Sequence, residues 1–145
     1  MSTFRIDPEK HQLLIDELVA IFQESGYSVV GADGVTGIPG VQKLHNDGYG
    51  DQENKAPDII ALNQDKRQMI IGEAKTGDGD FETEHALTQY NVFLDQVHPR
   101  TMVKAKLYII VPQSTLSEFS AFITHYIHPD YWDRLTLVSS KRVQQ

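Results

Sequence analysis

Three charged residues stand at the ends of two apolar runs of the sequence. Asp58 opens the run PDIIALN, and Glu73 and Lys75 close the run RQMIIGEAK. Strand residues that face a core are rarely charged, because a buried charge without a partner is costly. Two carboxylates and an amine held close together could bind a divalent cation and activate a water molecule. That chemistry requires the chain to bring the three side chains to one place.

The two runs are predicted to form an antiparallel hairpin around a tight turn at QDKR, residues 64–67. A turn centred there pairs residues equidistant from it, which places Asp58 across from Glu73. Cross-strand neighbours have Cβ atoms about 4.5–5.5 Å apart. Lys75 shares the face of Glu73, because side chains alternate along a strand. A slip of one residue would separate the three groups, so the prediction depends on this register.

Two carboxylates this close repel each other, so one pKa is expected to rise unless a cation lies between them. Lys75 supplies one positive charge. A hard divalent ion such as Mg²⁺, with Mn²⁺ as a substitute, would bind the remaining oxygens together with water or phosphate. Such an ion polarises a phosphoryl oxygen and lowers the pKa of a bound water. Lys75 could orient that water or neutralise charge that builds on the phosphate.

The elements expected around these residues are helices and strands in the order α-β-β-β-α-β-α-β. Asp7 as N-cap, Pro8 at the first helical position and Gly26 as terminator predict the first helix. Apart from the hairpin, the remaining patterns predict a strand at 27–30, a helix at 82–97, a strand at 104–112, a helix at 116–127 and a strand at 134–140. This order predicts an α/β fold in which helices flank a mixed sheet.

Residues 31–55 interrupt this order with a long glycine-rich segment. They hold six of the ten glycines and few periodic apolar positions, which predicts an irregular surface loop. A loop this long inside a compact domain is often functional, and disorder is the alternative. The 145 residues as a whole are expected to form a single domain.

The composition limits the classes of partner. Thirteen basic and 20 acidic residues give a net charge of −7, which argues against tight binding to a polyanion unless a local basic patch or a bound cation compensates. The chain has no cysteine, so it forms neither a disulfide nor a thiolate metal site. No run approaches the roughly 18 apolar residues of a membrane span. The first residues contain no apolar signal region, which favours a cytoplasmic protein without a membrane partner.

The charged residues and the order of elements together resemble the PD-(D/E)xK nuclease superfamily, which has the restriction-endonuclease-like fold. The motif stands here as Pro57-Asp58 followed by Glu73-Ala74-Lys75. The family core is similar to residues 8–112, with a C-terminal helix and strand added. The resemblance implies a three-layer fold, with Asp58, Glu73 and the Ala74 carbonyl as metal ligands and Lys75 as the catalytic lysine.

The resemblance also implies two further site residues. Many members add an acidic residue from the first helix, and Glu17 is the candidate because it lies at the rim of the apolar stripe, whereas Asp16 points outward. Some members add a glutamine on the helix after the motif lysine. Gln89 matches that position as a further catalytic residue, although Phe93 stands where those members have a tyrosine.

The implied activity is Mg²⁺- or Mn²⁺-dependent hydrolysis of phosphodiester bonds, with DNA favoured over RNA and an endonuclease over an exonuclease. Lys43, His45 and Lys55 in the glycine-rich loop are then candidates to contact backbone phosphate, with simple solvation as the alternative. A homodimer would supply two sites for two strands. The competing hypothesis is a non-catalytic nuclease-fold binding module, or a subunit of a larger nucleic-acid-processing assembly, which the acidic net charge favours.

Overall fold

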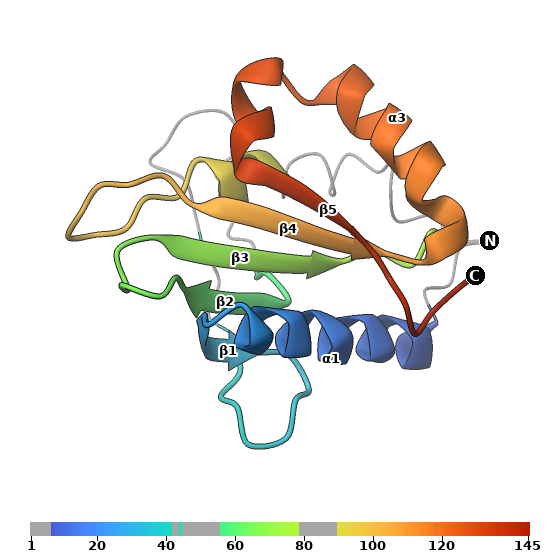
Figure 1. The fold of residues 1–145 in the computed structure, drawn as a ribbon, viewed down its shortest axis with the longest axis horizontal. Coiled ribbons are helices and arrows are strands. Elements are labelled where there is room, and N and C mark those ends of the chain that lie inside the picture. The colour runs from blue at the N-terminus through green and yellow to red at the C-terminus, as the bar shows by residue number, and fades with distance from the viewer. Residues whose placement is uncertain (1–6, 42–43, 45–55, 79–89) are drawn as a thin grey trace.

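A computed structural model describes residues 7–41, 44, 56–78 and 90–145. Its centre is a five-stranded sheet in the order β1-β2-β3-β4-β5 (Figure 1). The strands are β1 (Ser28–Ala32), β2 (Ile59–Leu62), β3 (Met69–Ala74), β4 (Lys106–Val111) and β5 (Leu135–Ser139). The pairs β1–β2 and β2–β3 are antiparallel, and the pairs β3–β4 and β4–β5 are parallel. The predicted α/β fold with a mixed sheet is confirmed.

Helix α1 (Pro8–Glu24) begins and ends where the sequence predicts. The Asp7 side chain accepts hydrogen bonds from the backbone amides of Glu9 and Lys10, so it caps the first turn. Gly26 follows the helix with a φ of +83°, a conformation that costs glycine little. The helix covers one face of the sheet (Figure 1). Its buried residues pack with strand residues of that face: Leu14, Ile15, Leu18, Val19 and Phe22 against Ala32, Ile59, Ala61, Ile70 and Ile110.

Gly72 allows α1 to lie directly on the central strand β3. A Cβ atom at this position would lie 3.0 Å from Leu18 Cδ2 and 3.1 Å from Phe22 Cε2. Both distances are shorter than ordinary van der Waals contact. The absence of a side chain therefore fixes how close the helix comes to the strand that carries Glu73.

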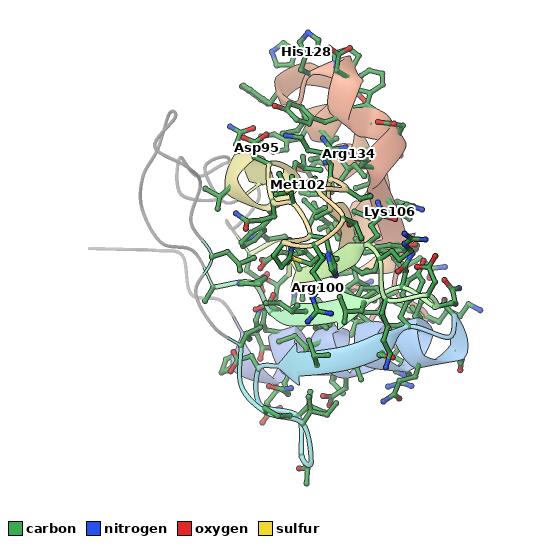
Figure 2. The ribbon with its side chains drawn as sticks, turned by 90° about the vertical axis from the view of Figure 1, so that its left-hand side faces the viewer. Asp95, Arg100, Met102, Lys106, His128 and Arg134 are labelled. Atoms are coloured by element: carbon green, nitrogen blue, oxygen red, sulfur yellow. The ribbon has the colours of Figure 1, made fainter. Side chains whose placement is uncertain are left out.

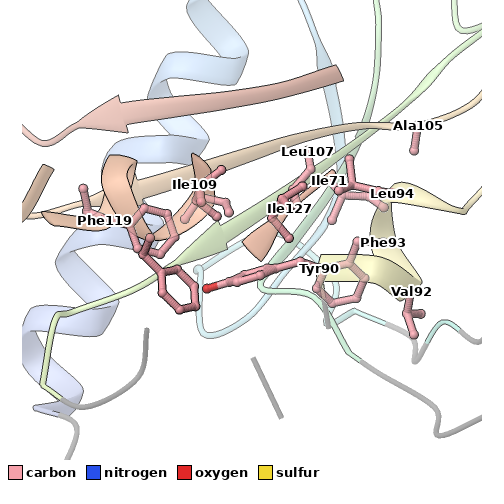
Figure 3. Packing of buried hydrophobic residues seen from close by; sticks show 13 residues of the cluster. Ile71, Tyr90, Val92, Phe93, Leu94, Ala105, Leu107, Ile109, Phe119 and Ile127 are labelled. Carbon is pink, nitrogen blue, oxygen red and sulfur yellow. The ribbon is translucent and has the colours of Figure 1, made fainter. Parts of the chain in front are cut away.

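The opposite face of the sheet packs against α3 (Leu116–Tyr126) and a short helical stretch at residues 90–94. Short 3₁₀ helices precede and follow α3 at Gln113–Thr115 and Pro129–Arg134. Figure 3 shows the aromatic side chains of this second cluster, Tyr90, Phe93 and Phe119, beside Ile71 and Ile109 of the strands. With α1 on the other face, the described residues form three layers. None of the described helices combines the length and the apolar content that crossing a membrane requires.

Several boundaries differ from the sequence predictions by one to three residues. The helix predicted at 82–97 ends at Leu94, and its residues 82–89 lie outside the described residues. Val97 forms an isolated bridge with Lys104 instead, and the Arg134 guanidinium donates hydrogen bonds to the carbonyls of Leu94 and Ala105. Strand β1 continues to Ala32, so the irregular segment begins two residues later than predicted.

Candidate functional site

The hairpin register brings Asp58 and Glu73 to the same end of β2 and β3. Ile59 pairs with Gly72, and Ile60 pairs with Ile71. Asp58 comes directly before the first of these strand residues, so the same register continued by one step puts it opposite Glu73. The predicted register is therefore confirmed.

Backbone amides join the two acidic residues. The Asp58 amide donates a hydrogen bond to Glu73 Oε1 at 3.1 Å. The Ala74 amide donates to Asp58 Oδ2 at 2.8 Å. Each carboxylate thus accepts a hydrogen bond from the backbone of the neighbouring segment. These two bonds fix both side chains where the pairing of the two strands ends.

Lys75 lies between the Glu73 carboxylate and an aromatic ring. Its Nζ is 3.7 Å from Glu73 Oε2 and 5.6 Å from the centroid of the Tyr90 ring. Glu73 and Lys75 are only 3% and 7% exposed, so their charges act on each other with little screening by solvent. The Lys75 amide donates to the Ile110 carbonyl at 3.0 Å, which ties this strand end to β4.

Burial raises the pKa of Glu73 well above its usual range, and the nearby charge of Asp58 raises it further. The positive charge of Lys75 and the hydrogen bond from the Asp58 amide act in the opposite direction but do not cancel this effect. Glu73 therefore holds its proton to a higher pH than an exposed glutamate does. A cation that binds the charged carboxylate has to displace that proton.

His11 is a neighbour of the site that was not predicted from the sequence. Its Nε2 lies 3.3 Å from Asp58 Oδ2. His11 precedes Leu14 and Ile15 by three and four residues, so it shares the side of α1 that faces the sheet. This spacing is the signal that could have identified it.

Glu17 is not where a ligand of this site would lie, and that prediction is corrected. The side chain is 5% exposed rather than at a rim. Its carboxylate accepts hydrogen bonds from the Ser140 hydroxyl at 2.6 Å and from the amides of Lys141 and Arg142 at 2.7 and 3.2 Å. These residues follow β5, which β4 separates from β3 in the sheet. Glu17 therefore fastens the segment after β5 to α1.

The other predicted residues are only partly described. Ala74 ends β3 beside both acids and pairs with Ile110. Gln89, Lys43, His45 and Lys55 lie outside the described residues.

The two carboxylates of Asp58 and Glu73 are as many as a hard cation such as Mg²⁺ usually needs from a protein, although each now accepts a backbone amide. Among the described histidine, aspartate and glutamate side chains, no group of three or more is arranged to hold a metal ion. Mg²⁺ is usually bound through one or two protein carboxylates, with water and substrate phosphate as the other ligands. Asp58 and Glu73 can supply those two carboxylates, and Asp58 Oδ1 and Glu73 Oε2 accept no backbone amide from the described residues.

Comparisons with known proteins assign no family to this geometry. No protein-family model, no curated protein and no solved structure matches the chain. Function must therefore be inferred from the side chains themselves. They bring two carboxylates, an amine and an imidazole to one strand end, a combination able to bind a hard cation and to neutralise an anionic substrate.

Proposed function

We propose that this protein is a metal-dependent nuclease with a restriction-endonuclease-like fold, which hydrolyses phosphodiester bonds of nucleic acid, DNA in preference to RNA. The supporting observation is the group of Asp58, Glu73 and Lys75, in which the Asp58 amide is 3.1 Å from one Glu73 oxygen and Lys75 Nζ is 3.7 Å from the other. A buried carboxyl with a raised pKa beside a specific charge partner is typical of a functional site. The three layers and the mixed sheet are compatible with the proposed fold.

In this mechanism Asp58, Glu73 and the Ala74 carbonyl would hold Mg²⁺ or Mn²⁺. The bound ion would polarise the phosphoryl oxygen and lower the pKa of a water molecule. Lys75 neutralises negative charge that builds on the phosphate, and the Tyr90 ring holds its amine in place. His11 keeps the Asp58 carboxylate oriented through its contact with Oδ2.

A non-catalytic binding module is the second candidate, and one observation favours it. Asp58 Oδ2 and Glu73 Oε1 already accept backbone amides, so the two acids could serve only to close the end of the hairpin. This candidate predicts that Mn²⁺ binding measured by calorimetry is absent or does not depend on the two acids. The nuclease predicts Mn²⁺ binding that Asp58→Asn weakens at least tenfold.

Cleavage assays test the proposal directly. Plasmid, single-stranded and branched DNA, and RNA, are incubated with Mg²⁺, with Mn²⁺ and with chelator. The variant Lys75→Met keeps an unbranched chain against Tyr90 and removes the charge, so we expect it to lose about 100-fold or more in rate. Lys141→Met removes an exposed cation after β5 and is expected to cut at the wild-type rate. The proposal fails if no substrate is cut, or if Lys75→Met cuts as fast as the wild type.

A further inference from the structure

Five basic residues gather at the edge of the sheet opposite Asp58 and Glu73. Lys66 and Arg67 lie in the turn between β2 and β3. Arg100 and Lys104 lie in the segment that leads into β4, and Lys106 is the first residue of that strand. The amino ends of β3 and β4 meet at this edge because the two strands are parallel. Figure 2 views the molecule from this side, with Arg100 and Lys106 labelled. We call residues 64–68 and 98–106 the basic edge.

The two segments of the basic edge are joined to each other. The Thr101 hydroxyl donates to the Arg67 carbonyl at 2.7 Å, and the Gln68 side-chain amide donates to the Lys104 carbonyl at 2.8 Å. Within the second segment, His98 Nδ1 accepts from the amides of Arg100 and Thr101 at 3.1 and 3.3 Å. A scaffold fixed in this way presents its cations with little backbone entropy left to lose on binding.

The cations of the basic edge are available to a ligand. None of the five forms an ion pair with another described residue, whereas Lys10 and Lys75 both do. The edge has one acidic residue, Asp65, which leaves eight basic and nineteen acidic residues in the rest of the sequence. The net negative charge of the chain therefore hides a locally positive surface.

The adjacent surface marks where the basic edge ends. An open cavity of about 470 Å³ adjoins the edge, and Lys104 lines it together with Asp95 and Asp130. Arg134 also lines this cavity, but its guanidinium is already bound to the carbonyls of Leu94 and Ala105. An anionic ligand is thus favoured on the basic edge and disfavoured beyond it.

An exposed apolar side chain stands among the cations. Met102 is 67% exposed and has a positive φ of 60°, which is uncommon for a residue with a side chain. It lies between Arg100 and Lys104 in the sequence, and Figure 2 shows it on the same side of the molecule as Arg100. Apolar and cationic side chains placed together suit a ligand with both phosphates and ring faces.

The proposed nuclease needs such a surface, because the described part of its site offers no exposed cation. Lys75 is 7% exposed, and Lys10 is paired with Asp78 at 3.1 Å. Most nonspecific affinity for nucleic acid comes from neutralising phosphates with basic side chains. We infer that the basic edge binds the nucleic-acid backbone, with Lys66, Arg67, Arg100, Lys104 and Lys106 on phosphates and Met102 against a sugar or base. The class of ligand rests on the proposed function.

Binding is measured in chelator, so that cleavage plays no part. Fluorescence anisotropy gives the Kd of labelled single-stranded DNA, single-stranded RNA and duplex DNA of about 20 nucleotides between about 50 and about 200 mM NaCl. The test variant is Arg100→Gln/Lys104→Gln. The control Lys141→Gln/Arg142→Gln removes two exposed cations after β5 and changes the net charge equally. We expect the test variant to bind about tenfold more weakly and its log Kd against log salt slope to fall by about two. We expect the control to match the wild type.

Three results would overturn this inference. The first is an equal loss of affinity in the test and control variants, which would mean that net charge alone decides binding. The second is no binding of wild-type protein to any of the nucleic acids. The third is tighter binding of labelled polyglutamate than of DNA, which would assign the edge to an acidic protein. If the test variant weakens binding but the wild type cuts nothing with either Mg²⁺ or Mn²⁺, the basic edge stands and the proposed nuclease fails. If the wild type cuts and both variants bind equally, the proposed nuclease stands and the inference about the basic edge fails.

Discussion

Opposing effects act on the pKa of Glu73. Its carboxyl is almost fully enclosed beside a second acid, which favours the protonated form, while Lys75 and the Asp58 amide favour the charged form. The first pair of effects is larger, so the pKa is raised. Since an additional positive charge would act against this shift, the protonation of the residue is sensitive to the arrival of a cation.

The raised pKa of Glu73 predicts how stability depends on pH. The native state keeps a proton that the unfolded state has lost, so this group costs the protein stability as the pH rises from the ordinary value of a glutamate through the raised value. Glu73→Gln cannot ionise and can still accept the Asp58 amide. We expect it to gain stability relative to the wild type as the pH rises above the ordinary glutamate pKa of about 4, measured by urea unfolding. Glu118→Gln, on the exposed side of α3, controls for net charge. A stability difference between Glu73→Gln and the wild type that stays constant with pH would contradict this expectation.

Residue-level prediction from the sequence succeeded where the interaction is local. Asp58 and Glu73 belong to one hairpin, so counting from its turn was enough to bring them together. Glu17 was misplaced because the position of a helical residue relative to the apolar stripe does not reveal which distant segment covers it. Its partner Ser140 is far away in the sequence, and no local pattern connects the two residues.

The packing of α1 against β3 is the contact between elements that positions the site. It depends on Gly72, where a methyl group would lie 3.0 Å from Leu18 Cδ2. We expect Gly72→Ala to destabilise the protein by about 1–3 kcal/mol, because the helix must move away or Leu18 must adopt a poorer rotamer. Urea unfolding measures the loss. Gly40→Ala is the matched control, since a Cβ there meets no atom of the described residues within 4 Å. Equal effects of the two substitutions would show that the close packing at Gly72 is unimportant.

The connection between α1 and the segment after β5 is expected to contribute to the stability of the fold. Glu17 accepts one hydroxyl and two amides there, and a hydrogen bond to a charged group contributes about 1.5–3 kcal/mol. Glu17→Ala is therefore expected to lower the free energy of unfolding by about 2–3 kcal/mol while leaving Mn²⁺ affinity unchanged. Asp16→Ala, one residue earlier, loses a single hydrogen bond among the described residues, from Gln12, and serves as the control. A loss of Mn²⁺ affinity in Glu17→Ala alone would restore it as a ligand.

The elements themselves were largely predictable, because their signals are local. Asp7, Pro8 and Gly26 define α1 through capping and backbone geometry. The early end of the helix at Leu94 was not predictable, because the apolar periodicity continues to Val97. The group that satisfies the last carbonyl there is Arg134, forty residues away.

For the binding of a polyanion, the distribution of charge over the molecule matters more than the net charge. The composition alone argues against a polyanion, yet the basic edge and the two acids lie at opposite ends of β3. At a rise of about 3.3 Å per residue, four residues from Met69 to Glu73 span about 13 Å. The spacing of phosphates along one strand of a duplex is about 3.4 Å, so a duplex that reaches both places needs at least about four further base pairs.

This separation predicts that the benefit of the basic edge depends on substrate length. For a single-stranded substrate of about 20 nucleotides, we expect Arg100→Gln/Lys104→Gln to lower kcat/KM about tenfold. For one of about two nucleotides, which cannot reach from the site to the edge, we expect no change. Cleavage rates of the two substrates by the variant and the wild type provide the measurement. An equal loss on both substrates would mean that the substitutions act through the site itself.

Features formed by segments that are far apart in the sequence could not be predicted from the sequence. Lys66 and Arg100 are far apart in the sequence, and only the parallel pairing of β3 with β4 brings their segments together. No local pattern in the sequence therefore indicates the basic edge. The homodimer remains a prediction.

The reciprocal amide bonds of Asp58 and Glu73 have a consequence for heat inactivation. The same two side chains that would carry the chemistry also close the open end of the hairpin. Fraying of that end would break both bonds together while the two apolar clusters remain packed. Catalytic competence would then disappear on warming before the bulk of the chain melts, and return on cooling without refolding.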